Sequence, residues 1–382
     1  MPLRVLIIPD KFKGTLTAMQ AAAAVARGWR RARPRDHLEL LPMSDGGDGF
    51  GEILSGLVGA QVQTLVSVDA AHRPCRVRWW WGARRRTAIV ESAKVIGLAM
   101  LPPGRYHPFG LDTFGLGKVL LAAAKRNCRR LIVGVGGSAT NDGGFGMARS
   151  LGWRFLDRLG NEIEKWTDLP RLELAQRPPG DRTDPGPQFR HPRVTVAVDV
   201  RNRLLGEHGC ARVYGPQKGL RPENWPLAEA CLRRLALVVK RQCGTDFAAI
   251  PGAGAAGGLG FGLMAFAGAR LESGTELFAR HARLAEHLRR TDLVITGEGA
   301  LDRSTLMGKG VGEVALQCQA LRVPCIGLAG VIQDAAPLQK RFAEVHALTP
   351  ELTTPDEARS RAGYWLSRLA ARVARAGALP TC

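Results

Sequence analysis

The stretch RRLIVGVGGSATNDGGFGMARSLGW occupies residues 129–153 and decides how the chain is expected to fold. Its apolar run, residues 131–133, is too short for a helix and is followed at once by glycine, which predicts a buried strand. Short polar residues follow the glycines, and from Phe145 onward apolar residues recur at helical spacing. A strand, a glycine-rich loop and a helix in this order present free backbone N–H groups, which bind anions. A tight turn without a ligand gives the same pattern, but three further glycine-rich loops favour phosphate.

The composition is that of a basic, loop-rich α/β protein. The chain has 382 residues, 45% of them hydrophobic, with 46 glycines and 23 prolines, which predicts two domains with ample cores. Its net charge of +20 comes mainly from arginines spread over nearly the whole length. Such a charge attracts anionic substrates.

Cysteine usage and the apolar stretches predict a cytoplasmic protein. The eight cysteines include no CxxC pair and no zinc-ligand spacing, which favours reduced thiols. The apolar run at residues 5–8 is too short for a signal peptide. The uncharged stretch 247–269 holds seven glycines and Pro251, so we expect a loop and a short buried helix rather than a membrane span.

Alternating strand and helix patterns at both ends of the chain enclose a region of different texture. Residues 62–68, 76–81 and 87–92 are β-like runs with almost no helix between them, which predicts an antiparallel meander. We therefore expect one discontinuous α/β domain, residues 1–62 and 287–382, interrupted by an inserted α/β domain, residues 63–286. Open α/β sheets bind their ligands at the carboxyl ends of their strands.

Aspartates beside glycine or at strand ends can reach a bound ligand: Asp45, Asp48, Asp199 and Asp302, of which Asp45, Asp199 and Asp302 are the candidate catalytic groups. One such carboxylate could accept a hydroxyl proton while Asp199 and Asp302 hold Mg²⁺. The alternative for each is a turn-forming side chain. The chain has 44 arginines and only 10 lysines, yet three of the lysines lie in glycine-rich loops: Lys13, Lys218 and Lys309. A lysine in such a loop suggests a position that needs a compact positive charge, as beside a phosphate.

Two further motifs keep other functions open. Residues 252–257 contain GxGxxG, a weak dinucleotide signature because Pro251 precedes it and no strand leads into it. This motif keeps open an NAD-dependent hydroxy-acid dehydrogenase. The arginine- and tryptophan-rich run at residues 76–86 keeps open nucleic-acid binding, but strand alternation separates Trp80 from Trp79 and Trp81, which favours a hairpin.

Six motifs in one order resemble those of the bacterial glycerate kinases: PDKFKGTL (9–16), DGGDG (45–49), GGSATNDGG (136–144), GPQKG (215–219), GAGAAGG (252–258) and TGEG (296–299) with Asp302 and Lys309. The resemblance implies a flavodoxin-like (Rossmann-type) parallel-sheet domain interrupted by a second α/β domain. It also implies ATP-dependent phosphorylation of D-glycerate, usually at the 2-hydroxyl, although a 3-phosphoglycerate product stays open. The sequence departs from the family pattern at Asp48, Phe50, Arg203 and Ser304.

The resemblance and the loops together give a set of hypotheses about the site. Asp45 or Asp199 would orient or deprotonate the substrate hydroxyl, and Lys218 or Lys309 would neutralise the phosphoryl group. ATP and Mg²⁺ would lie over loops that contain Lys13, Gly136, Gly137, Ser138, Asn141, Asp142, Gly254, Gly257, Gly258 and Glu298. Either domain could bind ATP. We expect no nucleic-acid or membrane partner, and a monomer or homodimer.

Overall fold

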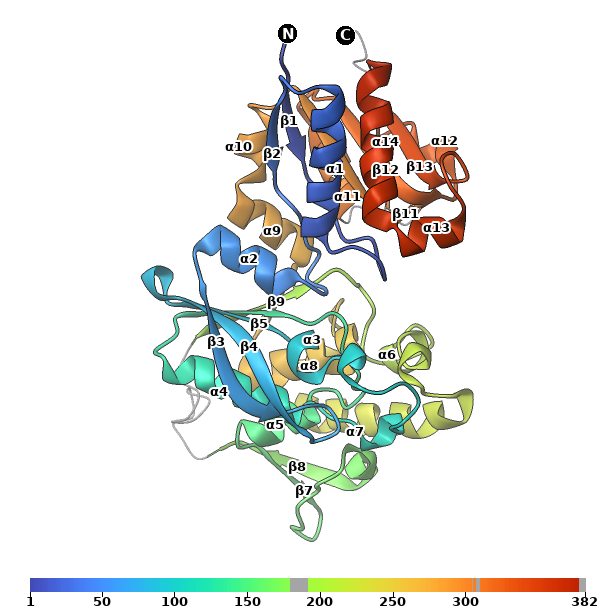
Figure 1. Ribbon diagram of the computed structural model, residues 1–382. Helices are drawn as coiled ribbons and strands as arrows, with labels where there is room; N and C mark the ends of the chain where they lie inside the picture. Colours follow the sequence, from blue (N-terminus) through green and yellow to red (C-terminus); the bar gives the residue numbers. More distant parts are fainter. Residues whose placement is uncertain (179–191, 304, 307–309, 378–382) are drawn as a thin grey trace. The chain divides into compact units, whose positions relative to one another are not determined.

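The structure is a computed structural model that describes residues 1–178, 192–303, 305, 306 and 310–377 (Figure 1). The predicted position of Lys309 therefore lies outside the described residues. The chain forms two compact units, one built from Met1–Asp45 and Thr275–Cys382 and the other from Gly46–Gly274. The fold class is confirmed, because a discontinuous α/β unit is interrupted by a second α/β unit.

The discontinuous unit has a five-stranded sheet in the order β2-β1-β11-β12-β13, and all of its neighbouring strands are parallel. This is the flavodoxin-like strand order. Its elements are β1 (Arg4–Ile7), α1 (Ala18–Ala32), β2 (His37–Leu40), α9 (Gly274–Ala282), α10 (Leu284–Leu288), β11 (Leu293–Leu301), α11 (Val311–Ala320), β12 (Cys325–Ile332), α12 (Ala335–Leu338), β13 (Glu344–Thr349), α13 (Pro355–Ser360) and α14 (Ala362–Ala376).

Strand β1, an interior strand of this sheet, is apolar on both faces, as a parallel strand between helix layers requires. Val5, Leu6 and Ile7 of β1 are all buried. Figure 1 shows α1 and α14 side by side on one face of the sheet, where their small residues pack together. Helix α1 begins at a capping box, in which Thr17 and Gln20 cap each other's backbone N–H groups.

The inserted unit has a six-stranded sheet in the order β3-β4-β5-β6-β9-β10 and a separate hairpin of β7 and β8. Its elements are α2 (Phe50–Val58), β3 (Gln61–Val68), β4 (Pro74–Gly82), β5 (Thr87–Glu91), α3 (Ala93–Ile96), α4 (Phe114–Lys125), β6 (Arg130–Gly134), α5 (Phe145–Ser150), β7 (Arg154–Asp157), β8 (Leu172–Gln176), β9 (Arg193–Val198), α6 (Cys210–Val213), α7 (Trp225–Cys243), α8 (Ala255–Ala267) and β10 (Arg270–Ser273).

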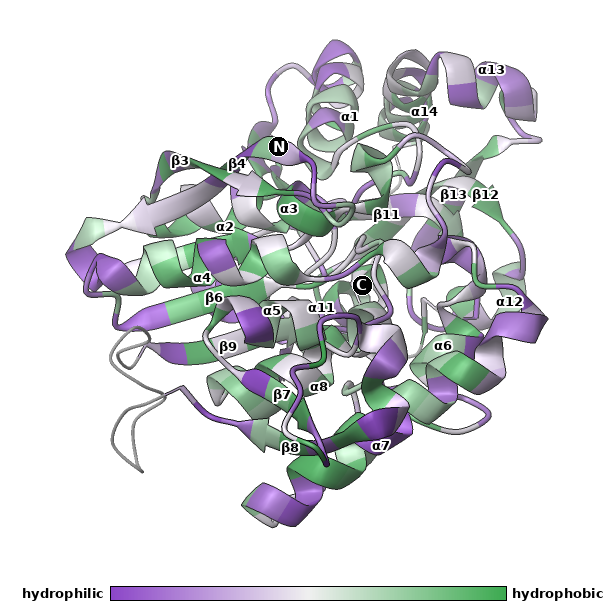
Figure 2. Ribbon diagram, turned by 90° about the horizontal axis from the view of Figure 1, so that it is seen from below, coloured by the Kyte–Doolittle hydropathy of each residue, from purple (hydrophilic) through white to green (hydrophobic). Residues whose placement is uncertain are grey.

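The predicted meander is confirmed, because β3, β4 and β5 pair antiparallel, whereas β5, β6, β9 and β10 pair parallel. The core of this unit lies between the sheet and helices α4, α5 and α8. Figure 2 shows the apolar residues of β6 and α8 in green. No helix in the described part of the chain has the length and apolarity that a bilayer crossing needs.

Both boundaries of the inserted unit differ from the sequence expectation. The units divide at Asp45, before the expected boundary at residues 62 and 63, because α2 packs on β4 and β5 of the inserted unit. The close contact of Gly51 with the Trp80 ring explains this packing. At the other boundary, the second segment of the discontinuous unit starts at Thr275 and not at the expected residue 287, so this unit includes α10. At the end of the chain, α13 and α14 are separated at Arg361, whose backbone leaves helical geometry (φ −128°, ψ 38°).

Candidate active site

In the discontinuous unit, the candidate site lies where β1 ends beside β11, which continues past it to Leu301. The strand order changes direction at this pair, and doubly wound sheets bind ligands at such a point. The chain leaving β1 stays attached to β11, since the N–H of Asp10 donates to the carbonyl of Gly297 at 2.9 Å. The Thr296 hydroxyl donates to the carbonyl of Ile8 at 2.7 Å. Asp10 and Glu298 are thereby held at the same edge of the sheet.

Four carboxylates lie close enough at this edge for three of them to repel the fourth, Glu298: Asp10, Asp45, Glu298 and Asp302. Burial, and then repulsion from the other three carboxylates, raises the pKa of Glu298 to about 7 although the Thr305 hydroxyl donates to it at 3.0 Å. Lys11 forms an ion pair with Asp45 at 3.1 Å. A concentration of carboxylate oxygens suits a hard divalent cation and disfavours an unaccompanied phosphate. The structure thus brings together three predicted residues, Asp45, Glu298 and Asp302.

Asp10 was not among the predicted site residues, although it lies in the PDKFKGTL motif. Its side chain is only 8% exposed, which marks it as unusual for an aspartate. The available signal was its position shortly after a buried apolar strand, similar to the signal that identified Asp199. The predicted phosphate-binding Lys13, from the same motif, is exposed.

In the inserted unit, Lys218 lies buried among loops, with 6% of the residue exposed. Its ammonium donates to the Ser138 hydroxyl at 3.0 Å and to the carbonyl of Thr140 at 2.7 Å. Burial lowers the pKa of Lys218 to about 8. A buried ammonium is costly without an anionic partner, so its presence here indicates a group that a ligand completes.

The neighbouring side chains of Thr140 and Asn141 are fully buried and lack partners. Within the described structure, the Thr140 hydroxyl and both the oxygen and nitrogen of the Asn141 amide make no hydrogen bond. Their backbone N–H groups likewise donate to no acceptor among the described residues. Buried polar groups are nearly always satisfied, and clustered exceptions mark places where a ligand or water binds. Thr140 was not predicted as a site residue, because a sequence does not reveal which polar side chains lack partners.

The start of α8 closes this group of residues. Ala256, Gly257 and Gly258 adopt left-handed backbone conformations (φ 56°, 72° and 86°). A Cβ on Gly257 would overlap the carbonyl oxygen of Thr140 and come within 2.9 Å of the Lys218 ammonium nitrogen. Only glycine fits there, because both the conformation and the close approach exclude a side chain. We call Ser138, Thr140, Asn141, Lys218 and Gly257 the Lys218 cradle.

Asp142, although predicted to contact the nucleotide, has its carboxylate turned into the loop interior. It accepts hydrogen bonds from the Thr113 N–H and hydroxyl at 3.0 and 2.7 Å, and from the N–H groups of Gly144 and Gly146 at 3.3 and 2.9 Å. Burial raises the pKa of Asp142 to about 6. These contacts fix the start of α5 and hold the preceding loop in shape.

The predicted glycines permit close backbone contacts. A Cβ on Gly254 would overlap the carbonyl of Arg203, and one on Gly258 would meet Gly143 at 2.9 Å. Gly136 packs in the same manner against Gly47. Gly137 has a positive φ of 74°. These glycines shape the loops around the Lys218 cradle.

Asp199 follows β9 in the inserted unit, where it accepts a hydrogen bond from the Ser273 hydroxyl at 3.0 Å. The other predicted metal ligand, Asp302, belongs to the discontinuous unit. The two predicted metal ligands therefore belong to different units. In the described parts of the chain, no group of three or more His, Cys, Asp or Glu residues is arranged to hold a metal ion.

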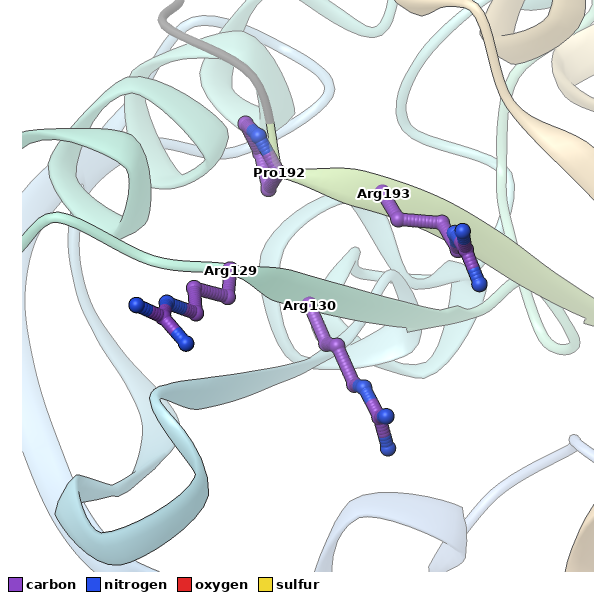
Figure 3. A pocket seen from close by; sticks show the side chains of 4 residues that line it. All are labelled: Arg129, Arg130, Pro192 and Arg193. Carbon is purple, nitrogen blue, oxygen red and sulfur yellow. The ribbon is translucent and has the colours of Figure 1, made fainter.

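A separate pocket lies at the opposite ends of β6 and β9, where these strands begin. It has a volume of about 520 Å³ and is lined by Arg129, Arg130, Pro192 and Arg193 (Figure 3). The glycine-rich loop and Asp199 follow the carboxyl ends of the same strands. None of the predicted site residues lines this pocket.

Comparison with known proteins identifies the family. A sequence model of the glycerate kinase family matches residues 5–378. A glycerate kinase of Halalkalibacterium halodurans is 35% identical over 376 residues, covering 97% of each chain, and the glycerate 2-kinase of Escherichia coli is 34% identical over 359 residues, covering 93% of each chain. A crystal structure assigned as glycerate kinase 2 of Salmonella typhimurium superposes with a TM-score of 0.81 at 31% identity, covering 98% of each chain. The chain belongs to the glycerate kinase family.

Proposed function

We propose that this glycerate kinase transfers the γ-phosphoryl group of ATP to D-glycerate and that the product is 2-phosphoglycerate. The observation that carries the proposal is the Lys218 cradle, whose buried ammonium and unpaired polar groups match an anionic, hydroxyl-bearing ligand. The E. coli relative that is named a glycerate 2-kinase supports the choice of the 2-hydroxyl. A 3-phosphoglycerate product is the alternative.

The carboxylates of the discontinuous unit are the proposed place for Mg²⁺. Their chemistry fits the ion, because Mg²⁺ takes oxygen ligands and is held by one or two carboxylates besides water and phosphate. Asp302 is the first candidate ligand, Glu298 contributes to nucleotide binding, and Asp199 remains a second candidate ligand. When bound, Mg²⁺ would neutralise charge on the phosphate oxygens.

The chain's own groups supply positioning and electrostatics. Lys218 would offset the negative charge of the anion that it binds, in a site from which water is largely excluded. Asp45 or Asp199 would accept the proton of the attacking hydroxyl or hold that hydroxyl in line. Lys309 keeps its proposed role beside the transferred phosphoryl group.

We further propose that the protein works in the cytoplasm as a monomer or homodimer without a nucleic-acid partner. The buried positions of Trp79 and Trp80, 3% and 2% exposed, argue against a stacking platform for bases. The seven cysteines in the described residues are free thiols, in keeping with a reducing compartment.

The proposal is tested by incubating the protein with ATP, Mg²⁺ and D-glycerate and analysing the product by ³¹P NMR. We expect ADP and 2-phosphoglycerate. Formation of 3-phosphoglycerate would overturn the regiochemistry alone. If folded protein produced no ADP above background at millimolar D-glycerate, the kinase proposal would fail.

A further inference from the structure

We propose that the Lys218 cradle holds the hydroxy acid itself, through its carboxylate and a hydroxyl, rather than the phosphates of the nucleotide. This inference rests on the proposed function and deepens it, because the glycine-rich loops around the cradle were expected to bind ATP. It assigns the acceptor substrate to the inserted unit.

The side chain of Asn141 has hydrogen-bonding capacity that the described structure leaves unused. Its amide offers two donors on nitrogen and an acceptor on oxygen, and in this structure both atoms are buried and unpaired. Turning the amide over leaves this unchanged, since both ends lack partners. A ligand that satisfies the residue must therefore both accept and donate hydrogen bonds.

Ionised phosphate groups cannot meet this requirement. At neutral pH their oxygens act almost entirely as acceptors, so a triphosphate would leave the Asn141 oxygen buried without a donor. Leaving a buried acceptor unpaired is unfavourable because the group has lost its hydrogen bonds to water. A hydroxy carboxylate matches both ends of the amide, because its carboxylate accepts and its hydroxyl donates. The unpaired Thr140 hydroxyl can serve the second hydroxyl of glycerate in either direction.

The charge of the cradle points to the same ligand. The cradle contributes one cation, Lys218, and two of its three N–H donors already engage Ser138 and Thr140. One ammonium donor remains, which suits a single carboxylate better than the several charges of a triphosphate. The fully buried Asp142 carboxylate lies close enough to Lys218 to affect its pKa, which further disfavours additional negative charge.

The experiment compares three ligands on the full-length protein: D-glycerate, propionate, which keeps the carboxylate but has no hydroxyl, and ADP. Dissociation constants are measured by ligand-observed NMR titration, with the acids titrated both in the absence and in the presence of ADP and Mg²⁺. The variants are Asn141→Ala and Thr140→Val, and the control is Asn161→Ala. Asn161 is an exposed asparagine that bonds only to Asp157 and lies outside the proposed site.

We expect wild-type protein to bind D-glycerate at least tenfold more tightly than propionate. Each cradle variant should weaken D-glycerate binding at least tenfold, reduce its preference over propionate, and change the affinity for ADP less than twofold. The control should resemble wild type. Thr140→Val is nearly isosteric, so it and the wild-type ligand comparison decide the question even if Asn141→Ala does not fold.

Two results would overturn the inference: weaker ADP binding in the variants with D-glycerate affinity unchanged, or a wild-type protein that does not distinguish D-glycerate from propionate under either condition. Failure of the kinase proposal gives a different pattern. In that case no phosphoglycerate forms, yet D-glycerate binding is still lost in the cradle variants.

Discussion

Replacing Lys218 by methionine should change how the stability of the protein depends on pH. Burial lowers the pKa of Lys218 to about 8 from its ordinary value of 10.5. Between these two pH values the unfolded chain keeps the proton that the folded protein has lost, so the stability of the wild type rises with pH. The contribution is fully present above the unfolded pKa and is lost as the pH falls through the folded pKa. Methionine has no such proton.

The unfolding free energy changes by about 1.4 kcal/mol for each pH unit over which the folded and unfolded states differ by one bound proton. Between pH 7 and pH 9.5, the unfolding free energy of the wild type should therefore gain about 2 kcal/mol relative to Lys218→Met. For a unit the size of Gly46–Gly274 this corresponds to roughly 4–8 °C in melting temperature.

The assay is thermal and urea unfolding of both proteins across this pH range, with the difference between them as the readout, so that titrations common to both proteins cancel. In a second assay, kcat/KM of the wild type should fall above pH 8 as the ammonium loses its charge, because this ratio reports the free enzyme. If the stability difference between the two proteins stayed constant with pH, the conclusion that burial lowers the pKa of Lys218 would be refuted.

Four further outcomes are expected. Asp45→Asn and Asp199→Asn should each lower kcat by at least ~10² with little change in melting temperature, and a variant with near-normal kcat would reduce that aspartate to a structural role. Lys218→Arg should lose nearly as much kcat as Lys218→Met, because the enclosed cradle has no room for a guanidinium; a silent Lys218→Arg would remove the lysine from the mechanism. Gly257→Ala should lower the melting temperature by several degrees, and a variant as stable as wild type would contradict the contact with Thr140. Glu298→Gln should raise the melting temperature at pH 8 but not at pH 4, because the raised pKa gives stability that is present below pH 4.5 and lost as the pH rises through about 7; equal shifts at both pH values would argue against that pKa.

The sequence predicted the features that depend on neighbouring residues. The apolar runs of β1, β6 and β11 are each followed within two residues by glycine or an acid, and in the structure each pairs with parallel neighbours. The antiparallel meander could also be predicted, because β3, β4 and β5 follow one another with short turns. In these cases the pattern that predicts each strand lies within a few neighbouring residues, even where its pairing partner is distant in sequence.

Features that depend on distant contacts could not be predicted. Helix α2 belongs to the inserted unit because of Trp80, which lies about thirty residues further along the chain. Asp142 and Asn141 are adjacent and similar in sequence, yet the carboxylate is fully hydrogen bonded and the amide is unpaired. That difference arises from Thr113 and from the loop before α8, so only tertiary structure separates the structural residue from the candidate ligand.

The insertion also dictates the order in which the two units can form during synthesis. In the flavodoxin-like sheet, Val5 of β1 pairs with Leu293 of β11, so this sheet cannot be completed until nearly 300 residues have been made. The inserted unit is continuous in sequence and emerges whole before that point, which lets it fold first. Within it, Gly46 contacts Ala197, and Ala197 pairs with Glu272, so both ends of the inserted chain meet beside β9. Folding of the insertion therefore shortens the effective loop between β1 and β11, and the late pairing of these strands loses far less chain entropy than their separation in sequence suggests.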